Sequence, residues 1–362
     1  MPITLKELSQ LAGVHPSTVA RVLQNDPRQR VSEELRARIM TLAREHQYRP
    51  NSVARSLRTK RSAVLGTLIP DISNPFFGSV LRGMEDAAAA RDYSIILANT
   101  DDLPAREANG LAMLRERQVD GLLLATARRN DPAIERLAAE RMPFVLVNRH
   151  TSPITPNTVV PDDYAGACAA VGHLLGLGHR RIAHIAGSDE ISTAYLRRQG
   201  YLDTLQSYGA PVDPALLVTG DFREQGGYDA MRALLDLNDP PTAVFAVNDL
   251  AALGALHALS DAGLRAPDDI SMVGFNDMFH ATYITPRLTT IQVPDRAMGA
   301  HAVERLLAMI LDDVWPESPL LLPVTLVARE TSGPPLARRG ALRPRRHAGG
   351  SVAASASGGK TR

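Results

Sequence analysis

The residues of this 362-residue chain that could bind a small polar molecule stand directly after short apolar runs. Their carboxylates and amides can hydrogen-bond hydroxyl groups, and an arginine among them can also pair with a carboxylate or phosphate. If the runs are parallel strands, their carboxyl ends meet at one edge of a sheet, where ligands bind in open α/β folds. The residues are Asp71, Asn148, Arg149, Asn248, Asp249, Asn276 and Asp277.

A second chemical signal lies near the amino terminus. Thr4 followed three residues later by Glu7 is a capping-box pattern. It predicts a helix that begins at Leu5. Gly13 should end that helix, and Pro16 can open another because a first-turn proline loses no needed N–H. Two short helices joined by a glycine-containing turn predict a helix-turn-helix, whose second helix can enter the DNA major groove. Taken alone, the pair could equally be a helical hairpin of an all-α domain.

The second helix separates an apolar side from a polar one. Val19 and Val22 should face the protein, while Ser17, Thr18 and Arg21 point to where base edges and phosphates would lie. Arginine can pair bidentately with guanine. Further on, Ser32 predicts the N-cap of a third helix, with an inner face formed by Leu35, Ile39, Leu42 and Ala43.

The elements that must position the strand-end residues alternate between strand and helix. Apolar runs at 63–69, 94–98, 121–125 and 144–147 are separated by helical patterns at 76–90, 107–117 and 132–140. The pattern restarts at 165–175, with further strands at 182–185, 243–247 and 271–275. This predicts an α/β fold of two doubly wound parallel-sheet lobes with a cleft between them, preceded by a small all-α helix-turn-helix domain.

Charge is distributed unevenly along the chain. Residues 1–61 hold twelve Lys and Arg against five Asp and Glu, residues 62–334 hold twenty-one against thirty-four, and residues 335–362 hold seven against none. If residues 1–61 alone contact DNA phosphates, this segment should be basic, while residues 62–334 can be acidic. The basic tail is rich in Gly and Ser and predicts disorder. Its charge is either solvated surface or an aid to nonspecific DNA binding.

The rest of the sequence argues against several classes of protein. The start of the chain has no apolar signal region, and no run of about eighteen apolar residues could span a bilayer. The one cysteine, Cys168, has no disulfide partner and reads as a small core residue. We therefore expect a cytoplasmic protein with no membrane contact. The chain has no P-loop, G-x-S-x-G, H-E-x-x-H or C-x-x-C motif, and we expect neither catalysis nor a cofactor or metal site.

Residues 4–23 and 48–58, including Tyr48, Pro50 and Asn51, resemble the lactose/galactose repressor (LacI/GalR) family nearly residue for residue. The similarity continues to about Pro334 through G-H-R-x-I at 178–182, R-x-x-G-Y at 197–201, N-D at 248–249 and L-T-T-I at 288–291. The resemblance implies a DNA-binding headpiece at 1–50 and a hinge helix and linker at 51–61. It also implies a two-lobed effector-binding and dimerisation domain at 62–334, ahead of the disordered tail at 335–362. Lobe 1 would comprise about 62–161 and 294–323, and lobe 2 about 162–291 and 324–334.

The resemblance further implies a mechanism. Two subunits would bind palindromic double-stranded operator DNA as a homodimer, with Leu57 wedged into the minor groove beside Ala54. The implied DNA-contacting residues are Thr4, His15, Pro16, Ser17, Thr18, Arg21, Ser32, Tyr48, Asn51, Ala54, Arg55 and Leu57. Residues about 80–90 are candidates for the dimer face. Closure of the cleft on a ligand would change the spacing of the first lobes and so the stability of the hinge.

The implied effector site adds three residues to the strand-end set: Phe76, Arg197 and Phe222. Alternatively, Phe222 packs within its loop and Arg197 pairs with a surface carboxylate. Asp249 could cap the helix that follows it. An aromatic ring, arginine, amides and carboxylates suit a sugar or sugar acid.

The chain departs from the family pattern at three positions. His15 and Ala20 replace serines that commonly touch phosphate, and Asn276 replaces an aspartate. We expect a ligand-controlled transcription factor, most simply a repressor. A periplasmic sugar carrier would need a signal peptide and no helix-turn-helix, and an enzyme on the two-lobed body would need cleft carboxylates that turn over a sugar.

Overall fold

The computed structural model describes residues 3–23, 31–48 and 61–335, and these form two units that divide after Ala63. The predicted helix-turn-helix and third helix are present in the first unit as α1 (Leu5–Ala12), α2 (Pro16–Leu23) and α3 (Glu33–Glu45). Thr4 and Glu7 form both bonds of the capping box, and Gly13 ends α1 with φ 71°. Ser32 caps α3 by accepting from the Leu35 N–H.

A small core holds these three helices together. It consists of buried side chains from each helix, namely Leu8, Ala12, Val19, Val22, Ile39 and Ala43. Leu35 and Leu42 pack against it only partly buried. Leu11, which helical spacing places near this side of α1, is instead 44% exposed.

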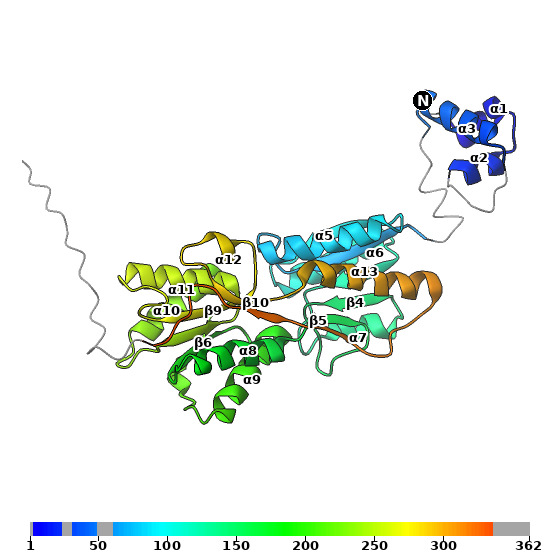
Figure 1. The fold of residues 1–362 in the computed structure, drawn as a ribbon. Coiled ribbons are helices and arrows are strands. Elements are labelled where there is room, and N and C mark those ends of the chain that lie inside the picture. The colour runs from blue at the N-terminus through cyan, green and yellow to red at the C-terminus, as the bar shows by residue number, and fades with distance from the viewer. Residues whose placement is uncertain (1–2, 24–30, 49–60, 336–362) are drawn as a thin grey trace, which may run out of the picture. The chain divides into compact units, whose positions relative to one another are not determined.

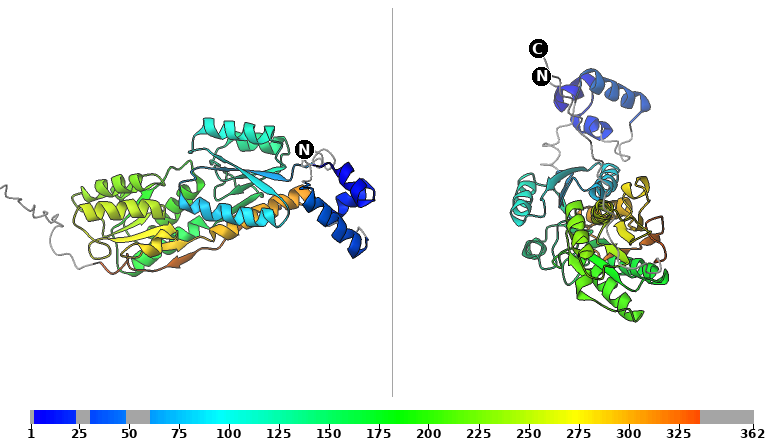
Figure 2. Two further views of the ribbon diagram at one scale, coloured as in Figure 1. Left: turned by 90° about the horizontal axis from the view of Figure 1, so that it is seen from above. Right: turned by 90° about the vertical axis from the view of Figure 1, so that its left-hand side faces the viewer.

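The second unit contains two six-stranded sheets, and the predicted fold class is confirmed (Figures 1 and 2). We call the first sheet and its helices lobe 1. Its strand order is β11-β5-β4-β3-β1-β2, and the paired strands are parallel. The strands are β1 (Val64–Ile69), β2 (Ser94–Asn99), β3 (Gly121–Leu124), β4 (Phe144–Val147), β5 (Thr158–Pro161) and β11 (Leu320–Leu322). The helices are α5 (Pro75–Ala89), α6 (Pro104–Glu116), α7 (Pro132–Ala139) and α13 (Asp295–Asp312).

Lobe 2 has the strand order β12-β10-β9-β8-β6-β7. Its strands are β6 (Ile182–Ala186), β7 (Leu217–Thr219), β8 (Ala243–Ala246), β9 (Ser271–Asn276), β10 (Thr289–Gln292) and β12 (Thr325–Val327). Its helices are α8 (Asp163–Gly176), α9 (Ser192–Ser207), the short 3-10 turn η1 (Pro214–Leu216), α10 (Glu224–Leu235), α11 (Asp249–Asp261) and α12 (His280–Tyr283).

The chain passes between the lobes after β5, after β10 and between β11 and β12. Only Pro323 and Val324 separate the last two strands. That short link brings β12 to its neighbour from the opposite direction, so β12 runs antiparallel to β10, unlike the other paired strands described. Four short strands, β5, β7, β11 and β12, had no clear signal in the sequence, and three of them are only partly buried.

Two helices of lobe 1, α5 and α13, pack closely against each other. In lobe 1, α5 crosses α13 at two glycines, where a Cβ at Gly83 would meet the Arg296 carbonyl and a Cβ at Gly299 would meet the Val80 carbonyl. Figure 2 shows α5 and α13 side by side. Without side chains at these two points the backbones can approach closely, which holds the start of α5 beside the cleft.

Candidate functional site

The exposed surface of α2 carries part of the predicted DNA-contact set. His15, Ser17 and Arg21 are exposed, whereas Pro16 and Thr18 are half-buried. The His15 Nδ1 atom accepts from the Ser17 N–H at 3.3 Å and lies 2.8 Å from Ser17 Oγ. An accepting Nδ1 places the proton of a neutral imidazole on Nε2, which leaves His15 able to donate from the exposed start of α2.

Two other members of the DNA-contact set serve as helix caps. The Thr4 hydroxyl donates to the Glu7 carboxylate at 2.8 Å and accepts from the Glu7 N–H at 3.3 Å. Ser32 caps α3, and Tyr48 packs half-buried against the three-helix core. Burial raises the pKa of the Tyr48 phenol. Asn51, Ala54, Arg55 and Leu57, with the predicted hinge helix, lie outside the described residues.

Between the lobes lies a cavity of about 220 Å³. We call it the cleft cavity. Lobe 1 contributes the segments that follow β1, β2 and β4, and lobe 2 contributes α9, the loop before α10, the start of α11 and the end of β9. Eight predicted residues line it: Asp71, Phe76, Asn148, Arg149, Arg197, Phe222, Asn248 and Asn276.

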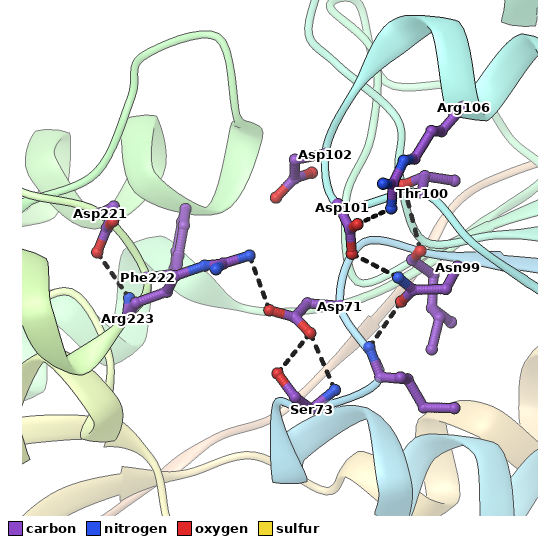
Figure 3. A network of polar contacts seen from close by, with 12 residues as sticks. Asp71, Ser73, Asn99, Thr100, Asp101, Asp102, Arg106, Asp221, Phe222 and Arg223 are labelled. Atoms are coloured by element: carbon purple, nitrogen blue, oxygen red, sulfur yellow. Dashed lines mark hydrogen bonds and ion pairs between the residues drawn. The ribbon is translucent and has the colours of Figure 1, made fainter.

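Each arginine of the cleft cavity is paired with a carboxylate. Arg149, whose side chain is 5% exposed, contacts both carboxylate oxygens of Asp102 at 2.5 and 3.3 Å. Arg223 reaches from lobe 2 to Asp71 of lobe 1 at 2.9 Å (Figure 3). Burial acts to raise the pKa of Asp71, but hydrogen bonds from Ser73 and the charge of Arg223 outweigh it and lower that pKa.

Arg197 is the third paired cation. Its guanidinium contacts Asp163 at 2.6 and 2.8 Å, donates to the Val247 carbonyl at 2.6 Å and lies 3.6 Å from the centre of the Phe275 ring. Burial raises the pKa of Asp163 to about 6, against the lowering effect of Arg197. The arginine therefore lines the cavity and pairs with a carboxylate that is buried, not with the surface carboxylate of the alternative.

Two amide oxygens of the cleft cavity have no hydrogen-bond partner. They are Oδ1 of Asn148 and Oδ1 of Asn276, in residues that are 7% and 6% exposed. Both residues follow or end a strand with positive φ, 64° at Asn148 and 118° at Asn276. Backbone strain of this kind costs about 1–3 kcal/mol and is typical of binding sites. A buried acceptor without a donor is also costly, so a ligand hydroxyl would relieve it.

Asn248 lines the cavity and also holds neighbouring segments in place. Its Oδ1 caps α11 by accepting from the Ala251 N–H at 2.8 Å, and its Nδ2 donates to the Phe222 carbonyl at 2.9 Å. The amide thus fixes the loop whose half-buried Phe222 ring lies 5.8 Å from the Arg149 guanidinium. Across the cleft, Phe76 is 3% exposed and packs edge-on against Phe77.

Two residues of the predicted effector set do not line the cleft cavity. Asp249 is fully buried, where its carboxylate accepts from the Thr290 hydroxyl at 2.5 Å and the Met278 N–H at 2.8 Å. Burial raises its pKa to about 7. Asp249 also does not cap α11, because Asn248 takes that position. Asp277 pairs with Arg329 at 2.7 Å behind the cleft-facing Asn276.

The cavity also includes residues that the sequence reading missed. Asp102 comes just after β2, so the strand-end rule could have found it. Figure 3 shows it beside Asp101, which instead pairs with Arg106. Arg223 follows Phe222 in the loop before α10, and Glu224 begins that helix, so no strand signal marks them and only the tertiary structure brings them to the cavity. In the described part of the chain, no helix is long and apolar enough to cross a membrane.

Comparisons with known proteins cover nearly the whole chain. Residues 4–51 match the family model for bacterial regulatory proteins of the lacI family, and residues 62–330 match the model for periplasmic binding proteins and the sugar-binding domain of the LacI family. The ribose operon repressor of Escherichia coli K12 is 34% identical over 90% of this chain and 98% of its own. The HTH-type transcriptional regulator DegA of Bacillus subtilis is 32% identical over 92% and 99%.

Solved structures agree with these relatives. The lac repressor dimer bound to operator and the anti-inducer ONPF has a TM-score of 0.81 at 29% identity, covering 92% of this chain and all of that one. A LacI family regulator from Enterococcus faecium with bound ribose has a TM-score of 0.67 at 34% identity, covering 75% of this chain and 99% of that one. A complex of the regulator CelR with cellobiose has a TM-score of 0.70 at 29% identity, covering 91% and 100%.

Proposed function

The chain belongs to the LacI family of bacterial regulatory proteins, and from this premise we propose how its two units act. It is a DNA-binding transcriptional regulator with a sugar-binding effector domain. In our proposal α2 reads a palindromic operator in a homodimer, and a neutral monosaccharide in the cleft cavity controls operator affinity. Repression is the mode that fits the repressors among its relatives.

The charge state of the cleft cavity supports a neutral ligand over a sugar acid. Arg149, Arg197 and Arg223 are each neutralised by a carboxylate of the protein. Asp221 and Glu224 add further negative charge to the lining. A carboxylate on the ligand would meet no unpaired cation here, so its dehydration would have little compensation. The paired arginines can still donate hydrogen bonds to uncharged hydroxyl oxygens.

Hydrogen-bonding capacity and size narrow the ligand further. The unpartnered oxygens of Asn148 and Asn276 need donors, which hydroxyl groups supply. A volume of about 220 Å³ is below the roughly 300–1,000 Å³ of pockets for drug-sized molecules, which favours one sugar ring. The aromatic rings of Phe76 and Phe222 can cover the apolar faces of such a ring.

The effector proposal is tested by a thermal-shift panel that begins with D-ribose and pairs each neutral monosaccharide with its acid, for example D-galactose with D-galacturonate. A ligand of the native state raises the melting temperature in proportion to its affinity. We expect the stabilising compounds to be neutral. A panel in which only acids or phosphates stabilise the protein would contradict the charge argument.

The DNA-reading proposal rests on the exposed face of α2. Arg21 is suited to a guanine edge or a phosphate. His15 offers the Nε2–H donor, and the Ser17 hydroxyl, which donates to His15 Nδ1, offers an acceptor. Thr4, Ser32 and Tyr48 would contribute mainly by fixing the helices. In gel-shift titrations on the native promoter, Arg21→Ala should weaken specific binding by about tenfold. Unchanged binding would remove Arg21 from the interface.

The proposed dimer face lies on α5 and the edge strand β2. Within the range 80–90, Val80 and Met84 are fully buried inside lobe 1, so they cannot contact a partner. The exposed side of α5 instead presents Arg82 and Glu85, next to a groove that continues to Tyr93 and Ile95. Analytical ultracentrifugation of Arg82→Glu should show dissociation of the dimer if this face is used.

We also propose that the protein performs no catalysis and works in the cytoplasm, where its DNA target lies. A regulator needs the effector released unchanged. Incubation of the protein with any sugar found by the panel should therefore return that sugar intact, and detection of a product would support the enzyme alternative.

A further inference from the structure

A second cavity lies in lobe 1, outside the cleft cavity, and encloses about 810 Å³. We call it the α7 cavity. One wall is α7, another is the 151–157 segment after β4, and a third is the 313–316 segment after α13. Its deep surface is apolar, since Ile134 and Phe144 are only 3% and 4% exposed and Met142 lies beside them. Trp315, 48% exposed, lines it together with Pro316.

Most polar groups in the walls of the α7 cavity are already satisfied by the protein. Asn157 donates to the Phe144 carbonyl at 2.8 Å, and the Thr151 hydroxyl donates to the Pro153 carbonyl at 3.0 Å. The Trp315 indole N–H donates to Asp313 at 2.9 Å. The cleft cavity differs in this respect, because two of its buried oxygens lack donors. A sugar would therefore gain few hydrogen bonds in the α7 cavity and would lose those it makes with water.

The walls are also held in place before any ligand arrives. Arg305 donates to the carbonyls of Pro156 at 2.9 Å and Ser318 at 2.8 Å, and so ties the second wall to the segment that carries Trp315. Arg129, at another side of the cavity, donates its backbone N–H to the Glu190 carbonyl of lobe 2 and stacks 3.6 Å from the centre of the Tyr195 ring. A preformed cavity binds more tightly because little ordering is needed on binding.

We propose that the α7 cavity is a second ligand site, specific for a flat aromatic molecule without net charge. Proline rings and an indole make rigid, flat apolar walls, against which an aromatic ring can stack or pack edge-on. The lining carries little net charge, because its two arginines, Arg129 and Arg141, are offset by three carboxylates, Asp131, Glu135 and Asp313. The assignment does not depend on the proposed sugar, since the two cavities share no lining residue.

The chain contains one tryptophan, so Trp315 reports on this cavity selectively. The probe is N-phenyl-1-naphthylamine, an uncharged aromatic fluorophore that accepts energy from tryptophan. Titration of the full-length protein should quench Trp315 emission saturably while probe emission rises. A rise in probe emission without quenching of Trp315 would place the probe elsewhere and overturn the proposal.

Paired variants on α7 sharpen the test. Ala138 lines the cavity and is exposed, so Ala138→Phe should fill the space without disturbing the core, and should weaken probe binding by about tenfold. Ala139→Phe, on the adjacent exposed residue that does not line the cavity, should bind the probe like the parent protein. Trp315→Ala, followed by probe emission, should also bind weakly. Parent-like affinity in Ala138→Phe and Trp315→Ala would refute the site.

Discussion

At the scale of single residues, two kinds of side chain determine what the cleft cavity can bind. Asparagine oxygens lack hydrogen-bond donors, and arginines are neutralised by carboxylates of the protein. Asn148 combines both features of a binding residue, an unpartnered buried oxygen and a left-handed backbone. The fold maintains this arrangement at a cost in free energy, which a bound hydroxyl would partly offset.

Asn148→Gly separates the strain from the ligand contact. Glycine adopts a φ of 64° without penalty, so the free energy of unfolding should not fall. Affinity for the neutral sugar should fall about fivefold, which corresponds to about 1 kcal/mol for one hydrogen bond. Calorimetric titration and urea unfolding measure the two effects. Asp92→Gly, at φ 59° in the exposed turn after α5, is the matched control and should leave sugar affinity unchanged.

Asp102→Asn should change which ligands bind. The substitution leaves the guanidinium of Arg149, now paired at 2.5 Å, without its carboxylate, and the cavity gains one positive charge. The affinity ratio of D-galacturonate to D-galactose should therefore rise by about tenfold. Asp101→Asn, which removes the partner of Arg106 outside the cavity lining, should not change the ratio. An equal ratio in both variants would mean that the charge of Arg149 does not govern selection.

At the scale of elements, the two-helix motif depends on the backbone conformation at Gly13. Its φ is 71°, and a Cβ placed there would meet no atom within 4 Å. Any effect of a side chain must then come from the left-handed conformation and not from a clash. Gly176, at the end of α8, has equally open space without positive φ.

Substitution by alanine should lower stability at Gly13 but not at Gly176. Gly13→Ala should destabilise the three-helix unit by about 1 kcal/mol, because the αL conformation is unfavourable for a residue with a Cβ. Gly176→Ala should be neutral or stabilise α8 by up to about 1 kcal/mol. Amide hydrogen exchange resolved by segment measures the change in stability of the three-helix unit and of α8. Equal destabilisation at the two sites would mean that the cost of a side chain at Gly13 does not come from its positive φ.

At the scale of the whole molecule, stability should depend on pH through a buried histidine of lobe 2. His184 is fully buried in β6, its ring stacks between Tyr201 and Phe245, and its Nδ1 lies 2.8 Å from the Phe245 carbonyl. Burial lowers the pKa of His184 to about 4. Between pH 6.5 and about 4 the unfolded chain therefore binds a proton that the folded chain does not, and stability falls as the pH falls through this window.

His184→Phe isolates this contribution, since phenylalanine can stack in the same place but cannot be protonated. Relative to the variant, the parent protein should lose roughly 3 kcal/mol between pH 7 and pH 4. Asp163 and Asp249, whose raised pKa values act in the opposite direction, are present in both proteins and cancel in the difference. Urea unfolding at several pH values measures it, and parallel pH profiles would contradict the assignment.

The sequence alone determined the local elements and the kind of molecule. The starts of the three N-terminal helices and the end of the first followed from Thr4, Gly13, Pro16 and Ser32, because caps and breakers act over a few residues. Apolar runs such as residues 121–125 identified the buried central strands, since a strand covered on both faces needs side chains of one type. Five of the seven strand-end residues line the cleft cavity. The motif pattern indicated the family.

Only the tertiary structure decided how those residues are partnered. Asp249 and Asp277 follow strands as the lining residues do, but packing turns them away from the cavity toward Thr290 and Arg329. The pairing of Arg149 with Asp102 joins positions 47 residues apart, and that of Arg223 with Asp71 joins the two lobes. Charge neutralisation and unpartnered oxygens depend on distances across the folded chain, and no local pattern in the sequence encodes those distances.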